Sequence, residues 1–162
     1  NKFLDQLNFK NLICFFIILI TFIFDRFTKI KIIELQTNNN SLFLNEYINL
    51  DLVWNTGIGF GLFSSESSLI YNFITGIICF VIMFLIYLIL NSKMTDKVLF
   101  SLILGGALGN VYDRLTYYAV PDFIDIHYKN FHWFTFNIAD IFITIGILVF
   151  ITKDLILKDE KN

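Results

Sequence analysis

The sequence predicts an α-helical integral membrane protein with four transmembrane helices and a small extracytoplasmic β-sheet. Apolar residues make up 56% of the 162-residue chain, charged residues only 16%, and the mean hydropathy is +0.67. A soluble domain carries about 25% charged residues, so this composition is too apolar for a protein surrounded by water. Four stretches of the chain reach the roughly 20 apolar residues that cross a bilayer as a helix.

The four predicted spans cover residues 12–33, 69–90, 98–115 and 136–157, and the chain 1–162 forms a single membrane domain. The first span continues into a charged helical turn and lacks a small-residue cleavage site, so we do not expect a cleaved signal peptide. The second span carries no charged residue, and the third contains the run GGALG. Small residues of this kind let a second helix approach closely.

The basic residues predict the orientation of the spans. Four spans place both termini on one side of the membrane, and seven of the 12 Lys and Arg residues fall on that side. Because basic residues favour the cytoplasmic side, we expect cytoplasmic termini. The outer segments 34–68 and 116–135 then face outward.

The outer segments show the pattern of strands. Residues 47–54 and 124–129 alternate between apolar and polar types, as half-buried strands do, so we expect a small sheet on the membrane surface. Residues 38–41 and 64–67 are typical of turns. The aromatic residues Phe131, Trp133, Phe134 and Phe136 suit the headgroup region of a bilayer.

Polar side chains interrupt three of the four spans, each time near the outer end. They are Asp25 and Lys29 in the first span, Asn110, Asp113 and Arg114 in the third, and Asn137 and Asp140 in the fourth. Ionisable residues within membranes normally face the interior of a bundle and pair with one another, so their common depth predicts one shared site. Each cluster also has a simpler interpretation: a snorkelling ion pair, an interfacial Asp–Arg pair and a helix N-cap.

Two outer motifs are open to more than one interpretation. Asp122 follows Pro121, the only proline, which restricts the preceding residue to extended backbone. Asp122 is therefore either presented by a stiff segment just outside the third span or exposed in a surface turn. The glycine-rich motif NTGIGFG at residues 55–61 lacks the helix that opens a phosphate-binding turn, which leaves a peptide-contacting loop or an ordinary turn.

Several chemistries are not predicted. His127 and His132 are the only histidines and lack the spacing of a helical zinc motif, and Cys14 and Cys79 stand far apart. The net charge of −2 does not indicate nucleic-acid binding. Carboxylates are the reactive groups that remain. Two aspartates held close together share a proton, so that one can activate a water molecule while the other protonates a substrate oxygen.

Four motifs together resemble the lipoprotein signal peptidase family (signal peptidase II), which are bacterial membrane aspartyl proteases. The motifs are DRFTK at residues 25–29, NTGIGFG at 55–61, GGALGNVYDR at 105–114 with VPDF at 120–123, and FNIAD at 136–140. They occur in the order of the family and reach from the first span into the fourth. The chain departs from the usual pattern at Arg26, Gly59 and Ile141, where the family commonly has Gln, Ala and a small residue.

The resemblance implies both a fold and a set of site residues. It implies a four-helix bundle with an outer β-cradle and a mobile loop over the site. The catalytic pair falls on Asp122 and Asp140; Asp113 and Asp125 are rival carboxylates that spacing alone does not eliminate. The residues that bind substrate or support the site fall on Asp25, Lys29, Asn55, Gly57, Asn110, Arg114 and Asn137.

The resemblance also implies a function. The family cuts a signal peptide just before a diacylglyceryl-modified cysteine, uses no metal or organic cofactor, and is inhibited by the cyclic peptide globomycin. We therefore expect a monomeric endopeptidase in the cytoplasmic (inner) membrane of a bacterium, in contact with lipids and a lipid-modified prolipoprotein. Two alternatives remain: a small proton-coupled transporter that uses Asp140 as a relay, and a purely structural membrane partner.

Overall fold

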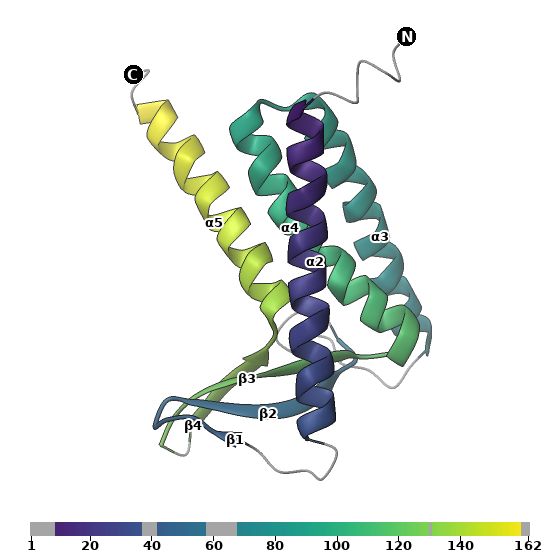
Figure 1. Ribbon diagram of the computed structural model, residues 1–162, viewed down its shortest axis with the longest axis vertical. Helices are drawn as coiled ribbons and strands as arrows, with labels where there is room; N and C mark the ends of the chain where they lie inside the picture. Colours follow the sequence, from purple (N-terminus) through teal and green to yellow (C-terminus); the bar gives the residue numbers. More distant parts are fainter. Residues whose placement is uncertain (1–8, 37–41, 58–67, 130, 160–162) are drawn as a thin grey trace.

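The computed structural model describes residues 9–36, 42–57, 68–129 and 131–159 (Figure 1). Its four long helices are α2 (Phe9–Leu35), α3 (Ser68–Asn91), α4 (Met94–Tyr117) and α5 (Ile138–Asp159). The first three extend the predicted apolar stretches by up to four residues at either end, whereas α5 begins two residues later than the predicted span 136–157, because Phe136 ends β4, and also ends two residues later. Two of the helices, α3 from Tyr71 to Asn91 and α4, are long and apolar enough to cross a membrane.

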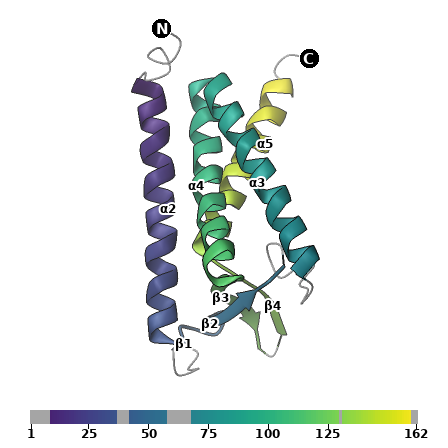
Figure 2. The same cartoon turned by 90° about the vertical axis from the view of Figure 1, so that its right-hand side faces the viewer.

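Helix α4 lies at the centre of the bundle and packs against α2, α3 and α5 (Figure 2). The core of the bundle is built of apolar side chains from α2, α3 and α4, namely Cys14, Ile82, Leu85, Ile89, Phe100, Ile103, Leu104, Ala107 and Val111. Large apolar side chains also cover the outward faces of the helices, among them Phe16, Phe80, Phe84 and Leu148. The helices therefore bury apolar residues against one another and also present apolar residues to their surroundings.

Glycines on α4 let two other helices approach closely, as GGALG predicts. A Cβ atom at Gly105 would lie 2.7 Å from Thr21 Cβ of α2, and one at Gly106 would lie 2.7 Å from the Ala139 carbonyl oxygen of α5. Real Cβ atoms do not make such short contacts. The backbone of α4 therefore touches α2 and α5 where any larger residue would force them apart.

The outer segments form one antiparallel sheet in the order β1-β2-β3-β4. Its strands are β1 (Leu42–Phe43), β2 (Ile48–Asn55), β3 (Val120–Tyr128) and β4 (Phe131–Phe136). The two predicted strands are confirmed as β2 and β3, although β3 begins four residues earlier than its apolar–polar alternation indicates. The segment 120–123 is thus the first part of a strand, which confirms the extended backbone expected before Pro121.

Two strands, β1 and β4, were not predicted. Strand β4 consists of the aromatic run FHWFTF, whose residues Phe131, Trp133 and Phe134 are exposed. Asp125 pairs with Thr135 and His127 with His132, so β4 has two residues between these pairs where β3 has one. This extra residue makes a β-bulge in β4. The turns predicted at residues 38–41 and 64–67 lie outside the described residues.

The sheet lies across one end of the helix bundle, and α2 begins and α5 ends at the opposite end (Figures 1 and 2). Strand β3 follows α4 after two residues, and α5 follows β4 after one. The junctions between helices and strands are therefore close together, and all the polar clusters named above lie at this end of the bundle.

Candidate active site

Asp122 lies near the start of β3 and is buried, with 2% of its surface exposed. Its two carboxyl oxygens accept hydrogen bonds from two amides. Asn55 Nδ2, at the end of β2, donates to Oδ2 over 2.9 Å, and Asn137 Nδ2 donates to Oδ1 over 2.6 Å. Asp122 is thus held inside the protein by the neighbouring strand and by the start of α5, and the surface-turn interpretation is wrong.

Asp140 lies in the first turn of α5 and forms a reciprocal cap with Asn137. The Asp140 backbone N–H donates to Asn137 Oδ1 over 3.1 Å, and the Asn137 N–H donates to Asp140 Oδ2 over 3.2 Å. This is the capping-box arrangement, in which two otherwise unpaired backbone donors are satisfied. The second oxygen, Oδ1, accepts a hydrogen bond of 3.0 Å from Asn110 Nδ2 of α4. The predicted N-cap is therefore confirmed, but Asp140 has a second partner that a simple cap does not need.

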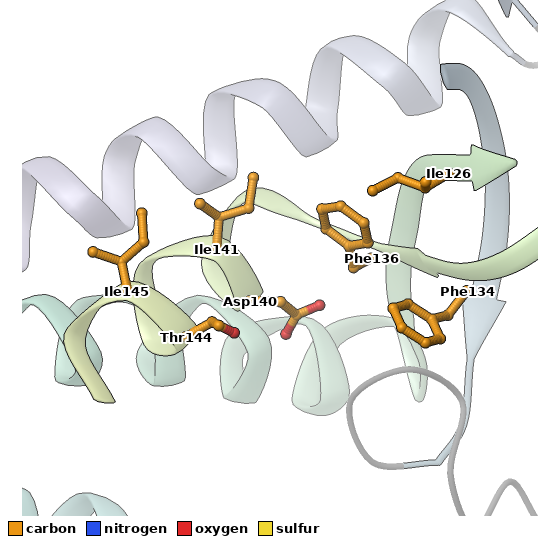
Figure 3. A pocket seen from close by; sticks show the side chains of 7 residues that line it. All are labelled: Ile126, Phe134, Phe136, Asp140, Ile141, Thr144 and Ile145. Carbon is orange, nitrogen blue, oxygen red and sulfur yellow. The ribbon is translucent and has the colours of Figure 1, made fainter. Parts of the chain in front are cut away.

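Asp140 also faces a pocket (Figure 3). Apolar and aromatic side chains from the sheet and from α5 line this pocket together with Asp140; they are Ile126, Phe134, Phe136, Ile141 and Ile145, with Thr144. A second pocket, between α3, α4 and α5, includes Asp140, Asn110 and Arg114. A carboxyl group at the border of apolar pockets is well placed to meet an extended, largely apolar ligand.

Asn137 joins the two carboxyl groups, because its side chain and backbone bind both Asp122 and Asp140. Its own surface is completely buried. Burial, followed by the negative charge of Asp140, raises the pKa of Asp122 from 3.8 to about 7. Asp122 can therefore hold a proton near neutral pH. We call Asp122 and Asp140 the dyad.

An ion cluster on α2 and α4 supports the dyad. Lys29 Nζ lies 2.9 Å from Asp25 Oδ2 and 2.7 Å from Asp113 Oδ2, and it donates to Asn110 Oδ1 over 2.8 Å. Lys29, Asp25 and Asp113 are all completely buried, unlike a snorkelling pair, whose charged ends reach water. Asp25 Oδ1 accepts a hydrogen bond of 3.0 Å from the Ala139 N–H. The cluster thus binds α2, α4 and the first turn of α5 together.

Arg114 connects the dyad region with the glycine-rich segment. It donates to the Gly57 carbonyl oxygen, and the Gly57 N–H in turn donates to Asn55 Oδ1 over 2.8 Å. Its Nε and Nη1 atoms are buried and have no hydrogen-bond partner among the described residues. The remaining residues of that motif, 58–61, and the mobile loop that the resemblance implies lie outside the described residues.

The structure brings all nine candidate residues into one hydrogen-bonded network. Starting from the ion cluster, the network passes through the asparagines to the dyad and then to the glycine-rich segment; its members are Asp25, Lys29, Asn110, Asn137, Asp140, Asp122, Asn55, Gly57 and Arg114. The residues that the sequence analysis expected in one shared site thus lie together, and their role as a site stays a prediction.

The two rival carboxylates have other partners. Asp113 forms ion pairs with Lys29 and with Arg26, whose guanidinium also lies over the ring of Tyr112 at 4.5 Å. Asp125 contacts His132, on the β3–β4 hairpin. The structure therefore favours Asp122 as the partner of Asp140, and it assigns to Arg26 a neutralising contact that the sequence analysis treated only as a departure from the family pattern.

Tyr71 of α3, which no sequence pattern indicated, donates its hydroxyl to the Arg114 carbonyl oxygen over 2.8 Å. The ring of Tyr71 lies under the Arg114 guanidinium, with 5.5 Å between the guanidinium carbon and the ring centroid. Tyr71 is the polar residue that α3, the span without charge, contributes here. A tyrosine at the outer end of an apolar helix is an ordinary interfacial residue, so no signal in the sequence set it apart.

Comparison with known proteins identifies the family of this chain. The family model described as signal peptidase (SPase) II matches residues 17–156. A lipoprotein signal peptidase of Pelagibacter ubique is 47% identical over 162 residues, which are 98% of this chain and 98% of the relative. One from Thermodesulfovibrio yellowstonii is 40% identical and covers 91% of this chain and 95% of its own.

A solved structure agrees as well. It is described as a bacterial membrane enzyme, superposes with a TM-score of 0.78 at 29% sequence identity, and covers 92% of this chain and 91% of its own. The match of the family model and the near-complete coverage of the relatives include every residue of the network described above. The chain belongs to the signal peptidase II family.

Proposed function

We propose that this chain is a membrane aspartyl endopeptidase that removes the signal peptide from prolipoproteins and cuts just before the diacylglyceryl-modified cysteine. Membership of the signal peptidase II family and the names of the relatives support this function. The observation that carries it is the pair of carboxyl groups bound to one asparagine, one buried and the other half-buried, since Asn137 contacts both Asp122 and Asp140.

The reaction divides acid and base roles between the dyad. Asp122, with its raised pKa, carries the shared proton and donates it to the carbonyl oxygen of the scissile peptide bond. Asp140 is at the N-terminal end of α5, where the helix dipole favours negative charge, and it removes a proton from the attacking water. The tetrahedral intermediate then loses its C–N bond, the nitrogen takes the proton from Asp140, and Asp122 regains a proton from the hydroxyl group.

The other residues of the network position the dyad and the substrate. Asn137 and Asn110 fix the carboxyl groups, and the ion cluster around Lys29 fixes the helices that carry them. The free Nε and Nη1 donors of Arg114 bind carbonyl oxygens of the substrate peptide, since no described residue uses them. Globomycin-type inhibitors, being peptides, would occupy the same place.

In the proposed membrane arrangement all four helices span the cytoplasmic membrane of a bacterium, with the termini in the cytoplasm. The sheet end, which carries the dyad, then lies at the outer face (Figure 2). The exposed apolar side chains around the bundle support contact with lipid. This depth suits a lipid-anchored substrate, because its acyl chains remain in the bilayer while the peptide bond reaches the dyad. The protein acts as a monomer that needs no cofactor.

The transporter interpretation explains less. Carriers of that kind place their binding site near the middle of the membrane, between repeated halves. Here α3 contains no charged residue, and the network lies at one end of the bundle. Family membership also favours the peptidase.

The test measures cleavage of a diacylglyceryl-modified prolipoprotein by the purified full-length chain in detergent. We expect the Asp122→Asn and Asp140→Asn variants to cleave at least about 100-fold more slowly, since each removes an acid–base group. Asp51→Asn is the matched control, because Asp51 is an exposed aspartate on β2. If either dyad variant is folded and cleaves at the rate of the control, the dyad assignment is wrong.

A further inference from the structure

Three potential metal ligands gather on the β3–β4 hairpin, outside the network of the dyad. Within the described part of the chain, Asp125, His127 and His132 form a group whose ligand atoms all lie within 4.8 Å of one another. Asp125 and His127 are two residues apart on β3 and share one face of the strand, and His132 of β4 pairs directly with His127. Ile126, between them, points to the other face, where it lines the pocket of Asp140 (Figure 3).

The two imidazole side chains converge on one carboxyl oxygen of Asp125. Asp125 Oδ2 lies 2.7 Å from His132 Nδ1 and 3.6 Å from His127 Nδ1. The two imidazole rings are stacked, with their centroids 5.2 Å apart and an angle of 23° between their planes. Two nitrogen atoms and one carboxylate oxygen thus face a common point from two adjacent strands.

Two buried polar atoms at this place have no hydrogen-bond partner among the described residues. The Nδ1 atom of His127 is buried without a hydrogen bond among the described residues, and only 9% of the His127 side chain is exposed. Asn49 of β2, which pairs with Asp125 across the sheet, likewise has a buried Oδ1 atom without a described partner. Unsatisfied buried polar atoms are uncommon and call for an explanation such as an ion.

We propose that Asp125, His127 and His132 bind a divalent transition-metal ion of the zinc class, with water in the remaining position. Imidazole nitrogen with one carboxylate is a donor set that suits such ions, whereas Ca²⁺ and Mg²⁺ require mostly oxygen ligands. Bonds of about 2.1 Å place the ligand atoms of a tetrahedral site roughly 3.4 Å apart. The His127–Asp125 separation of 3.6 Å already fits, and the shorter His132–Asp125 separation opens when the ion replaces the proton of that hydrogen bond.

The ion would join the two strands that lead to the dyad. Strand β3 carries Asp122 three residues before Asp125, and β4 ends at Phe136, next to Asn137. A metal bridge between His127 and His132 would fix the pairing of these strands beyond their bulge. The site is therefore structural, on the opposite face of β3 from the pocket, and takes no part in the hydrolysis.

The experiment titrates the full-length chain in detergent with Co²⁺, after any histidine tag has been removed and bound metal has been stripped with a chelator. Co²⁺ bound by nitrogen and oxygen ligands in a tetrahedral site has visible absorption bands, which Zn²⁺ abolishes when it displaces Co²⁺. We expect about one Co²⁺ per chain, displaced by Zn²⁺. We also expect Asp125→Asn and His132→Ala to weaken binding by at least about tenfold, and Asp51→Asn to leave it unchanged.

The His132→Ala variant keeps the test decisive if changes in the buried residues disturb folding, because 57% of the His132 side chain is exposed. A second readout is thermal unfolding, since an ion that binds only the folded chain raises its stability at concentrations above the Kd. We expect Zn²⁺ to raise the melting temperature of the wild type but not that of His132→Ala. Absence of saturable Co²⁺ binding, or equal binding by the wild type and His132→Ala, would overturn the proposal.

Discussion

Replacing Asp122 with Asn tests whether this buried carboxyl group carries a proton in the folded protein. The pKa of Asp122 is raised from 3.8 to about 7 by burial and by the charge of Asp140. The folded chain therefore binds this proton more tightly than the unfolded chain. The stabilisation that results is complete below pH 3.8 and is lost as the pH rises through about 7.

The size of the effect follows from the shift. Each pKa unit corresponds to about 1.4 kcal/mol, so the whole shift amounts to about 4 kcal/mol. Part of this stabilisation is already lost at about pH 5, because the carboxyl group of the unfolded chain is ionised there. The stabilisation that is still present at about pH 5 amounts to about 3 kcal/mol, and it disappears by about pH 8.5. The Asn variant lacks this titration. We expect the wild type to lose about 3 kcal/mol more stability than the variant over this range.

The assay is equilibrium unfolding by SDS in mixed detergent micelles, followed by far-ultraviolet circular dichroism at both pH values. The comparison is made on the change of unfolding free energy with pH, which is unaffected by any constant cost of the substitution. Such a cost is expected because the new amide can accept only one of the two hydrogen bonds that Asn55 and Asn137 donate. Asp51→Asn, which leaves Asp122 in place, is the control for the substitution itself. Equal pH dependence in the wild type and in Asp122→Asn would refute the protonated Asp122 on which the proposed acid step depends.

Two further predictions concern the packing and charge that support the dyad. A Cβ atom at Gly109 would collide with the Asp25 carboxylate, whereas one at Gly76 meets no atom within 4 Å. We expect Gly109→Ala to cost about 1–3 kcal/mol of unfolding free energy and to slow cleavage, and Gly76→Ala to be neutral or stabilising. Similar stabilities of the two variants would contradict the close approach of α2 and α4. Lys29→Met removes a buried cation from two carboxylates, at an expected cost of about 3–5 kcal/mol, while exposed Lys31→Met should cost less than about 1 kcal/mol. Both pairs are measured by the same SDS unfolding, and a small effect at Lys29 would show that its ion pairs contribute no net stability.

The helices could be predicted from the sequence because apolar length alone determines them. A run of about 20 apolar residues is long enough to form one continuous helix, and the four helices lie at the four runs. The strand β4 could not be predicted in this way. Its sequence FHWFTF places aromatic side chains on both faces, so no alternation is visible, and its pairing with β3 includes a bulge.

The shared site could be predicted from the depth of its polar residues, but not the partner of each residue. Asp113 and Arg114 are neighbours on α4, and successive residues of a helix point about 100° apart. Asp113 consequently faces Lys29 of α2, while Arg114 faces Gly57, two residues after the end of β2. Which carboxylate meets Asp140 depends on how the helices are rotated about their axes, and the resemblance to the family, not the spacing, indicated Asp122.

The histidines show why spacing along the chain was a poor guide to ligand geometry. The helical spacing that was sought brings residues four apart onto one face, whereas His127 and His132 are five apart and belong to two strands. Their hairpin pairs them directly and places Asp125 beside them. That arrangement could be recognised only after β4 had been identified as a strand.

The ion cluster explains how a carboxylate pair is held at the edge of an apolar bundle. Buried charges are costly, and an ion pair repays that cost only when its geometry is good and further hydrogen bonds satisfy its remaining atoms. Lys29 meets both conditions, because two carboxylates and the Asn110 amide oxygen surround its ammonium group. Asn110 is thereby oriented with its Nδ2 toward Asp140. The neutral amide of Asn110 therefore links the ion cluster on α2 to the dyad and fixes the position of Asp140.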